Sequence, residues 1–169
     1  MIVLMAGLPG SGKSTLCREL AVVTSGLVLS KDEIRAALFP SSSVEYSSEQ
    51  DDFCMRVMLD AAAYTLKKDP QRIVFLDGRT FSRRYQLDQV VATAAELGQP
   101  WRILECVCSE QTARKRIKEQ SGSHPAKDRD YELYLRLKER FQEITLPKTV
   151  MDTEQPLQAC VALAREALT

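Results

Sequence analysis

The sequence contains no asparagine, a single histidine and no net charge, with 23 basic and 23 acidic residues among 169. Without asparagine the chain lacks the Asn-Lys-x-Asp motif by which GTPases normally recognise guanine, and this excludes a GTPase. The balanced charge gives no global electrostatic reason to expect a polyanion or a membrane surface as a partner. Any contact with nucleic acid would have to be local.

Cysteines are few and long apolar runs are missing. The five cysteines are an odd number without a Cys-x-x-Cys spacing, and several lie in apolar stretches, which predicts reduced thiols that act as small hydrophobic residues. No apolar run reaches the roughly 18 residues of a membrane span, and the sequence opens on an apolar strand without the pattern of a signal peptide. We therefore expect a cytoplasmic protein with no membrane partner, folded as one domain over residues 1–169.

One stretch carries a specific chemical signal, a Gly-x-x-x-x-Gly-Lys-[Ser/Thr] loop between an expected strand and an expected helix. The loop consists of Gly7, Leu8, Pro9, Gly10, Ser11, Gly12, Lys13, Ser14 and Thr15. Its glycines let the backbone direct N–H groups at phosphate oxygens, and the N-terminus of the following helix adds a favourable dipole. We expect this loop to bind ATP, with Lys13 on the β- and γ-phosphates and the Ser14 hydroxyl on Mg²⁺.

Apolar strand-like runs alternate with helical segments along the whole chain. The expected strands are 2–5, 27–29, 73–76, 102–107 and 149–152, and the expected helices are 14–24, 30–39, 49–68, 82–97, 109–118, 131–144 and 157–168. This alternation predicts an α/β fold with a five-stranded parallel sheet and helices on both faces. The third helix carries an apolar stripe with three further apolar residues beside it, and most of this set is expected in the core: Phe53, Val57, Ala61 and Tyr64, with Cys54, Met58 and Leu66. The sixth helix is expected to turn Leu133, Leu137 and Phe141 toward the core.

Charged residues follow the second and third expected strands directly. In an open parallel sheet, ligands gather beyond the carboxyl ends of the strands. Asp32 and Arg35 are three residues apart, so they share one face of a helix that Ser30 can cap. Asp77 suits either a Mg²⁺ ion bound through water or a substrate-binding arginine such as Arg35 or Arg79. For Asp32 and Arg35 the alternative is an acid that caps the helix and an arginine on the surface. For Asp77 the alternative is an ordinary Asp-Gly turn.

A basic helix and a loop rich in glycine, serine and proline occupy residues 109–130. This pattern is expected of a small lid over the nucleotide, although a solvated helix face is the alternative for any single cation. His124 precedes a proline in the loop and is assigned no chemistry. Cys106 and Cys108 share a strand face and are expected in the core, because no histidine or further cysteine stands at ligand spacing.

The third strand also argues against hydrolysis as the main activity. Motor and AAA-type ATPases usually place a glutamate after the strand-end acid, whereas Gly78 follows Asp77 here. The chain instead resembles the small P-loop kinases around polynucleotide kinase, adenylylsulfate kinase and short predicted kinases often labelled AAA-type ATP-binding proteins. The resemblance rests on the phosphate loop, Asp32-x-x-Arg35, Asp77 and the basic helix before the lid.

The resemblance implies a P-loop three-layer sandwich with strand order 2-3-1-4-5. It also implies that Asp32 accepts the proton of the acceptor hydroxyl and that Arg35 holds an anionic group of the acceptor. Lids of such kinases often carry two arginines, and Arg116 matches the first of them, while Gln120 stands in place of the second. The missing contact to the γ-phosphate would then fall to one of three other cations: Arg114, Lys118 or Arg129.

These observations predict an ATP-dependent phosphotransferase that moves the γ-phosphate to a hydroxyl of a small, anionic acceptor. Lys13, Asp32 and Arg116 are the expected catalytic residues. Arg114 and Arg116 would add to the ATP site, Arg35, Asp77 and Arg79 would bind the acceptor, and Ser14 and Asp77 would bind Mg²⁺. Two alternatives stay open. One is a 5′-hydroxyl polynucleotide kinase, favoured by Asp32-x-x-Arg35, and the other is an ATP-binding regulatory module with little turnover, suggested by Gln120.

Overall fold

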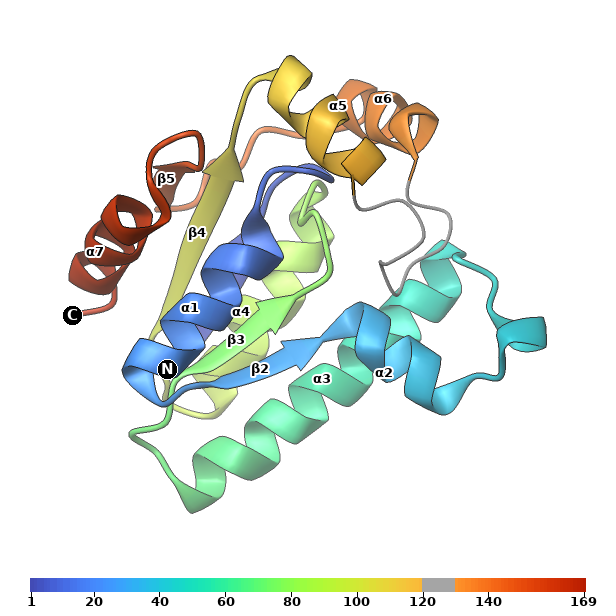
Figure 1. Cartoon of the computed structure of the whole chain (residues 1–169). Coiled ribbons are helices and arrows are strands. Elements are labelled where there is room, and N and C mark those ends of the chain that lie inside the picture. Colours follow the sequence, from blue (N-terminus) through green and yellow to red (C-terminus); the bar gives the residue numbers. More distant parts are fainter. Residues whose placement is uncertain (120–129) are drawn as a thin grey trace.

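The computed structural model describes residues 1–119 and 130–169, and its centre is a five-stranded parallel sheet (Figure 1). The strands are β1 (Ile2–Ala6), β2 (Leu27–Ser30), β3 (Val74–Asp77), β4 (Trp101–Val107) and β5 (Thr149–Asp152). Their order across the sheet is β2-β3-β1-β4-β5, and every neighbouring pair is parallel. The expected α/β class and strand order are confirmed.

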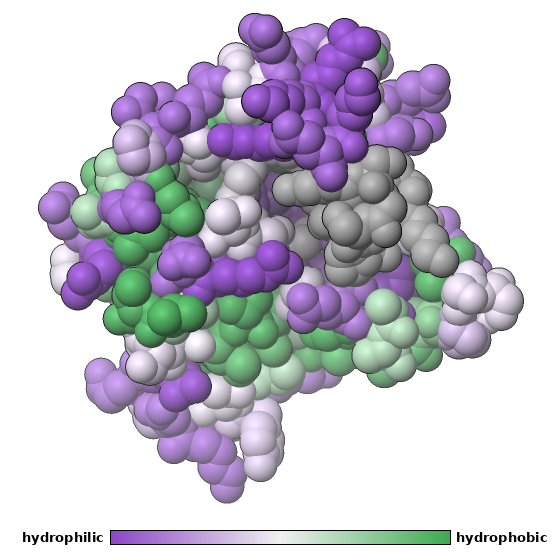
Figure 2. Space-filling model, viewed as in Figure 1, coloured by the Kyte–Doolittle hydropathy of each residue, from purple (hydrophilic) through white to green (hydrophobic). Residues whose placement is uncertain are grey.

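Helices cover both faces of this sheet. The helices α1 (Lys13–Thr24) and α7 (Leu157–Ala167) pack on one face, and α3 (Ser48–Lys68) and α4 (Arg84–Glu96) pack on the other. The helices α5 (Glu110–Glu119) and α6 (Tyr131–Glu139) lie together beyond the carboxyl end of β4. Figure 2 shows hydrophilic side chains gathered at that end of the molecule. None of the helices described is both long and apolar enough to cross a membrane.

Alternation along β1 explains the two cores. Successive side chains of a strand point to opposite faces of the sheet. Ile2 and Leu4 therefore join the core under α3 and α4, while Val3 and Met5 join the core under α1 and α7. All four side chains are fully buried, as expected of a central strand in a parallel sheet covered on both faces. This buried strand leads directly into the phosphate loop and holds its first glycine in place.

Two serine caps mark the starts of α2 (Lys31–Leu38) and α3, the helices on either side of the loop that follows α2. Ser30 caps α2 by accepting a hydrogen bond from the Glu33 N–H at 3.4 Å, which confirms the expected cap. After a short 3₁₀ turn (Ser41–Ser43), Ser47 caps α3 by accepting from the Gln50 N–H at 3.1 Å. The caps set where each helix begins, and the ion pairs of Asp51 with Lys31 and Arg35 hold the starts of α2 and α3 next to each other.

The core face expected for α3 is confirmed only in part: Cys54, Met58 and Leu66 are buried, whereas two residues of the main stripe are not. Phe53 and Tyr64 are 41% and 68% exposed. The buried side chains of the helix lie one position further round, at Cys54, Met55, Met58, Ala62 and Leu66. Both stripes have helical spacing, and only the packing of α3 on the sheet selects between them. Phe53 instead contacts the ring of Phe39 edge to face, with the centroids 5.8 Å apart.

The helix expected over 131–144 ends at Glu139, because the chain turns back toward the start of α4. There the Gln142 N–H donates to the carbonyl oxygen of Ser82 at 2.9 Å, and Ile144 enters the core under α3 and α4. Helix α4 begins at Arg84, two residues later than expected, since the backbone of Arg83 is extended and Arg83 is the N-cap residue. Residues 120–129 of the expected lid, with Gln120, His124 and Arg129, lie outside the described residues.

Four of the five cysteines are buried, whereas Cys108, expected on a strand face in the core, lies just past β4 and is only half-buried. The buried thiols give a testable pH dependence. Cys17 and Cys106 are buried, and burial raises the pKa of both thiols, that of Cys106 to about 12 from an ordinary 9.0. A group with a raised folded-state pKa stabilises the fold below its unfolded pKa and loses that contribution as pH rises toward the folded value. We expect the free energy of unfolding, measured by urea denaturation, to fall between pH 9 and 11. A Cys17→Ala, Cys106→Ala double variant that fell just as steeply would contradict this cause.

Candidate active site

The phosphate loop connects β1 to α1, and two of its glycines occupy positions that no other residue would fit. Gly7 has φ of +128°, and a Cβ atom there would lie 2.2 Å from the carbonyl oxygen of Cys106. Gly10 has φ of +77°, and its Cβ would lie 2.7 Å from the carbonyl oxygen of Ala113. Backbone atoms cannot move aside at such distances, so the loop needs glycine at both positions. The predicted loop therefore has the tight backbone path that phosphate binding requires.

The Lys13 side chain lies along this loop. Its Nζ donates to the carbonyl oxygens of Gly7 and Leu8 at 2.7 and 2.8 Å, and the side chain is largely buried. Lys13 and Ser14 both line a cleft beyond the carboxyl ends of the strands. The loop therefore presents a fixed positive charge and a hydroxyl group on the same side, as binding of a Mg²⁺-nucleotide requires.

The cleft has a volume of about 450 Å³, within the usual range for a small-molecule site. Residues from the phosphate loop, α2, α3, the end of β3, the start of α4 and α6 meet around it. Its charged lining residues are Lys13, Lys31, Asp32, Arg35, Asp51, Arg79, Arg83, Arg136 and Arg140. Seven of these nine are cations, although the whole chain is neutral. The tertiary structure thus concentrates positive charge where an anionic substrate would bind.

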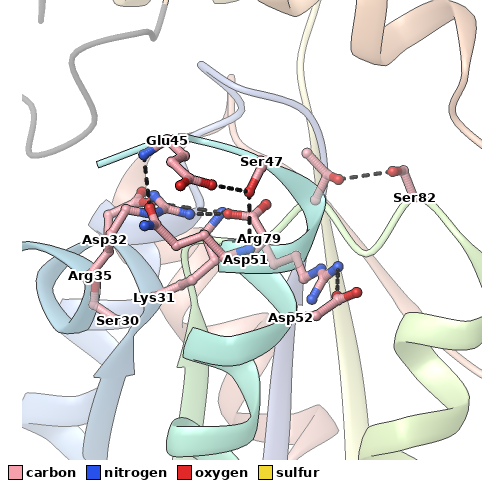
Figure 3. Close-up of polar contacts among 12 residues, drawn as sticks. Ser30, Lys31, Asp32, Arg35, Glu45, Ser47, Asp51, Asp52, Arg79 and Ser82 are labelled. Carbon is pink, nitrogen blue, oxygen red and sulfur yellow. Dashed lines mark hydrogen bonds and ion pairs between the residues drawn. The ribbon is translucent and has the colours of Figure 1, made fainter. Parts of the chain in front are cut away.

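Asp32 and Arg35 lie on the same side of α2 and form an ion pair, as their spacing predicted. The Arg35 Nη1 donates to Asp32 Oδ1 at 2.9 Å, and the Arg35 Nη2 donates to Asp51 on α3. Lys31 Nζ donates to the same Asp51 oxygen at 2.8 Å (Figure 3). Two cations and two carboxylates thus fix one another across the first turns of α2 and α3. Arg35 is only 3% exposed, so its guanidinium is held rigidly at the cleft wall.

Arg79 is held in a similar way from the neighbouring strand end. Its Nη2 donates to Asp52 on α3 and, at 3.2 Å, to the hydroxyl oxygen of Tyr85. Arg79 is 4% exposed, and its Nε and Nη1 atoms are buried with no hydrogen-bond partner in the described part of the chain. Asp51 and Asp52, adjacent in sequence, thus orient arginines from two different elements (Figure 3). Sequence analysis missed both of these aspartates. The available signal in the sequence was a pair of acidic residues near the start of a helix that a serine can cap.

Asp77 is the last residue of β3 and stands in register with Ser30 of β2. It forms no ion pair with Arg35 or Arg79, because the α3 carboxylates hold both arginines, so the arginine-orienting role predicted for it was wrong. Its Oδ1 atom is buried without a hydrogen-bond partner among residues 1–119 and 130–169. An orphaned carboxylate oxygen beside the phosphate loop fits a hydrated Mg²⁺ ion, which prefers oxygen ligands and keeps most of its waters.

The two arginines predicted on the basic helix do not line the cleft. The Arg114 guanidinium lies over the ring of Tyr131, 4.8 Å from its centroid. Arg116 donates from Nη1 to the Thr153 hydroxyl at 2.9 Å and from Nη2 to the Thr153 carbonyl oxygen at 2.7 Å. Its Nη1 also donates to the carbonyl oxygen of Gly10 at 3.4 Å. Arg116 thus joins α5 to the phosphate loop and to the segment after β5.

Helix α6 supplies cleft residues that sequence analysis assigned to the core or missed. Leu133, Arg136, Leu137 and Arg140 all line the cleft, whereas Tyr134 packs against α5 and Lys138 pairs with Glu110 at 2.6 Å. The cleft residues follow the spacing i, i+3, i+4 and i+7, which places them on one face of a helix. That spacing was visible in the sequence, but nothing in it showed which element the face would meet.

Comparisons with known proteins agree with this architecture. A family model described as an AAA domain matches residues 2–144. Among solved structures, the APS kinase of Mycobacterium tuberculosis, in complex with AMPPNP and APS, aligns with a TM-score of 0.73 at 17% identity over 99% of this chain and 96% of that chain. A sugar kinase from Janibacter sp. aligns with a TM-score of 0.71 at 15% identity over 99% and 93%.

Kti12 of Chaetomium thermophilum, solved with ADP-AlF3, aligns with a TM-score of 0.69 at 17% identity over the full length of both chains. At such identities the three structures establish a shared fold only. No curated protein sequence matches the chain. The family match covers most of the chain, including the phosphate loop, Asp32, Arg35 and Asp77. The protein therefore belongs to this AAA domain family and has the P-loop fold of small kinases.

Proposed function

We propose that the protein is an ATP-dependent phosphotransferase that moves the γ-phosphate of ATP to a hydroxyl group of a small, anionic acceptor. One observation carries this proposal. The phosphate loop, through Lys13 and Ser14, shares a single cleft with Asp32 and a set of rigidly held arginines. Nucleotide analogues bound to proteins of the same fold, AMPPNP and ADP-AlF3, support ATP as the donor.

Positioning and charge neutralisation supply most of the rate enhancement in phosphoryl transfer. The loop N–H groups and Lys13 hold the β- and γ-phosphates, which requires the Lys13 amine to leave the loop carbonyl oxygens when nucleotide binds. Mg²⁺, held by the Ser14 hydroxyl and by Asp77 through water, would neutralise charge that develops on the phosphate oxygens.

Asp32 orients the acceptor hydroxyl and takes its proton. Within the described residues its contacts to Arg35 at 2.9 Å and to Lys31 at 3.8 Å both use Oδ1, which leaves Oδ2 to accept a hydrogen bond from the substrate. Arg35 and Arg79 form the wall against which the acceptor binds.

A polynucleotide with a 5′-hydroxyl end is the second candidate acceptor, because the Asp32–Arg35 pair occurs here at the spacing such kinases use. A single strand held by several phosphate contacts binds more weakly as the salt concentration rises. The logarithm of its binding constant falls against the logarithm of the salt concentration with a slope of about −0.7 per contact. The cations line one cleft of about 450 Å³, and the chain is neutral overall. Both observations favour a small molecule over a long strand as the acceptor.

The two candidates are separated by transfer of radiolabelled phosphate from ATP to a panel of small hydroxyl compounds and to a 5′-hydroxyl oligonucleotide. We expect transfer to a small anionic compound and a shallow salt dependence. Efficient end-labelling of the oligonucleotide with a steep salt slope would overturn the small-molecule choice. Tight ATP binding without transfer to any acceptor would instead point to a regulatory module.

A further inference from the structure

Three arginines at the outer part of the cleft differ from the others. Arg83, Arg136 and Arg140 line the cleft and are exposed, and within the described residues none of them has a carboxylate partner. By contrast, Lys31 and Arg35 are paired with Asp32 and Asp51, and Arg79 is paired with Asp52. The outer part of the cleft therefore carries three positive charges without a carboxylate partner in the part of the chain that the structure describes.

The fold brings these three arginines together by specific contacts. After α6, the Gln142 N–H donates to the Ser82 carbonyl oxygen at 2.9 Å, and the Arg84 N–H donates to Gln142 Oε1 at 3.1 Å. These bonds tie the end of α6, where Arg140 lies, to the start of α4, where Arg83 lies. On its other side α6 is held to α5 by Tyr134 and by the Lys138–Glu110 pair, so Arg136 and Arg140 face the cleft.

Neither the nucleotide nor the catalytic pair accounts for this charge. Lys13 serves the nucleotide phosphates, and the cations beside Asp32 already have carboxylate partners. Like charges placed close together repel and destabilise the protein unless an anion binds between them. Arginine presents a planar, bidentate set of donors that matches phosphate and sulfate oxygens better than lysine does. Arg79 lines the same cleft, and two of its nitrogens are buried without a partner among residues 1–119 and 130–169, so it adds to the cationic lining that also contains Asp32.

We propose that Arg83, Arg136 and Arg140 form a second anion site, which binds a phosphomonoester or sulfate group carried by the acceptor. This inference rests on the proposed function and makes it more specific: the substrate class is a small hydroxyl compound that already bears a strongly charged tetrahedral anion. The anion binds at the α4–α6 end of the cleft while the reacting hydroxyl lies at Asp32. A neutral alcohol would leave the three guanidinium groups uncompensated and would bind weakly.

Inorganic sulfate tests the site without knowledge of the acceptor. With AMPPNP and Mg²⁺ saturating the phosphate loop, sulfate is titrated into the protein and followed by calorimetry. We expect one sulfate to bind per chain and each of Arg83→Ala, Arg136→Ala and Arg140→Ala to weaken it at least tenfold. Lys115→Ala is the matched control, because Lys115 is an exposed cation on α5 whose nearest carboxylate, Glu119, is 4.0 Å away. It should leave sulfate affinity unchanged.

Two further arms decide the outcome. Lys13→Ala, which should disable the phosphate loop, is expected to keep sulfate binding that still depends on Arg136. Glycerol 3-phosphate should displace sulfate, and glycerol should not. Sulfate affinity that is absent in the wild type, or equal in the wild type and the arginine variants, would overturn the second site. AMPPNP binding and phosphoryl transfer from radiolabelled ATP are measured separately on the same protein, so a failure of the proposed function appears as lost nucleotide binding or as absent transfer, whatever sulfate does.

Discussion

Lys13→Ala is expected to abolish ATP turnover and to weaken nucleotide binding strongly. The Lys13 amine lies on the phosphate loop, 2.7 Å from the Gly7 carbonyl oxygen, and lines the cleft. When nucleotide binds, it is the cation of the loop itself that can reach the β- and γ-phosphates. Removing it leaves the loop N–H groups without the point charge that neutralises the transferring group. Calorimetric titration with ATP and Mg²⁺ and a radiolabelled transfer assay measure the two effects.

The Lys13→Ala result needs a test of folding, because the lysine also bonds to two loop carbonyl oxygens. Thermal melting of the variant reports whether the domain is intact, and Lys115→Ala removes a cation of the same type from an exposed site on α5. Equal nucleotide affinity and equal turnover in Lys13→Ala and the wild type would show that the loop is not the nucleotide site.

Asp32→Asn is expected to lower the rate of phosphoryl transfer by roughly 10²–10⁴-fold, the usual range for a positioned acid or base, and to leave ATP affinity nearly unchanged. Asparagine has almost the same shape as aspartate but cannot take the proton of the acceptor hydroxyl. The transfer rate at saturating ATP and the dissociation constant of AMPPNP separate the two effects.

Asp51→Asn is the matched control for Asp32→Asn. It removes the same charge from the same ion-pair cluster, since Asp51 also contacts Lys31 and Arg35, but it keeps Asp32 in place. We expect Asp51→Asn to act mainly on the KM of the acceptor, through a less rigid Arg35, and Asp32→Asn to act on kcat. If both variants lost the same small fraction of kcat, Asp32 would be a structural member of the cluster and no base.

Local sequence was sufficient to predict the phosphate loop and the Asp32–Arg35 pair at the start of the helix after β2. The loop needs glycine where φ is positive and backbone atoms are close, and these requirements leave a recognisable spacing of residues. Asp32 and Arg35 meet because a helix places residues three apart on one face, and Ser30 caps that helix. Such relations span a few residues, so the sequence alone carries them.

Local sequence was not sufficient to show which face of a helix packs against which neighbouring element. In α3 the stripe through Phe53 and the stripe through Cys54 have the same period, and the sequence did not show that only the stripe through Cys54 is buried. On the basic helix, the charge pattern and, for Arg116, the resemblance to kinase lids predicted that Arg114 and Arg116 reach ATP; in the structure these arginines contact Tyr131 and Thr153. These partners lie far from the arginines in sequence or across an intervening loop.

The amino-acid sequence by itself thus determined the phosphate loop, the alternation that builds a covered parallel sheet, and the Asp32–Arg35 pair. Only the tertiary structure decided that Asp51 and Asp52 orient the arginines and that α6 completes the cleft with Arg136 and Arg140. The physical reason is the separation in sequence between the residues that interact. Hydrogen bonds and periodicity within one element are set by neighbouring residues, whereas a cleft forms where several elements pack, and its charge depends on contacts between residues distant in the chain.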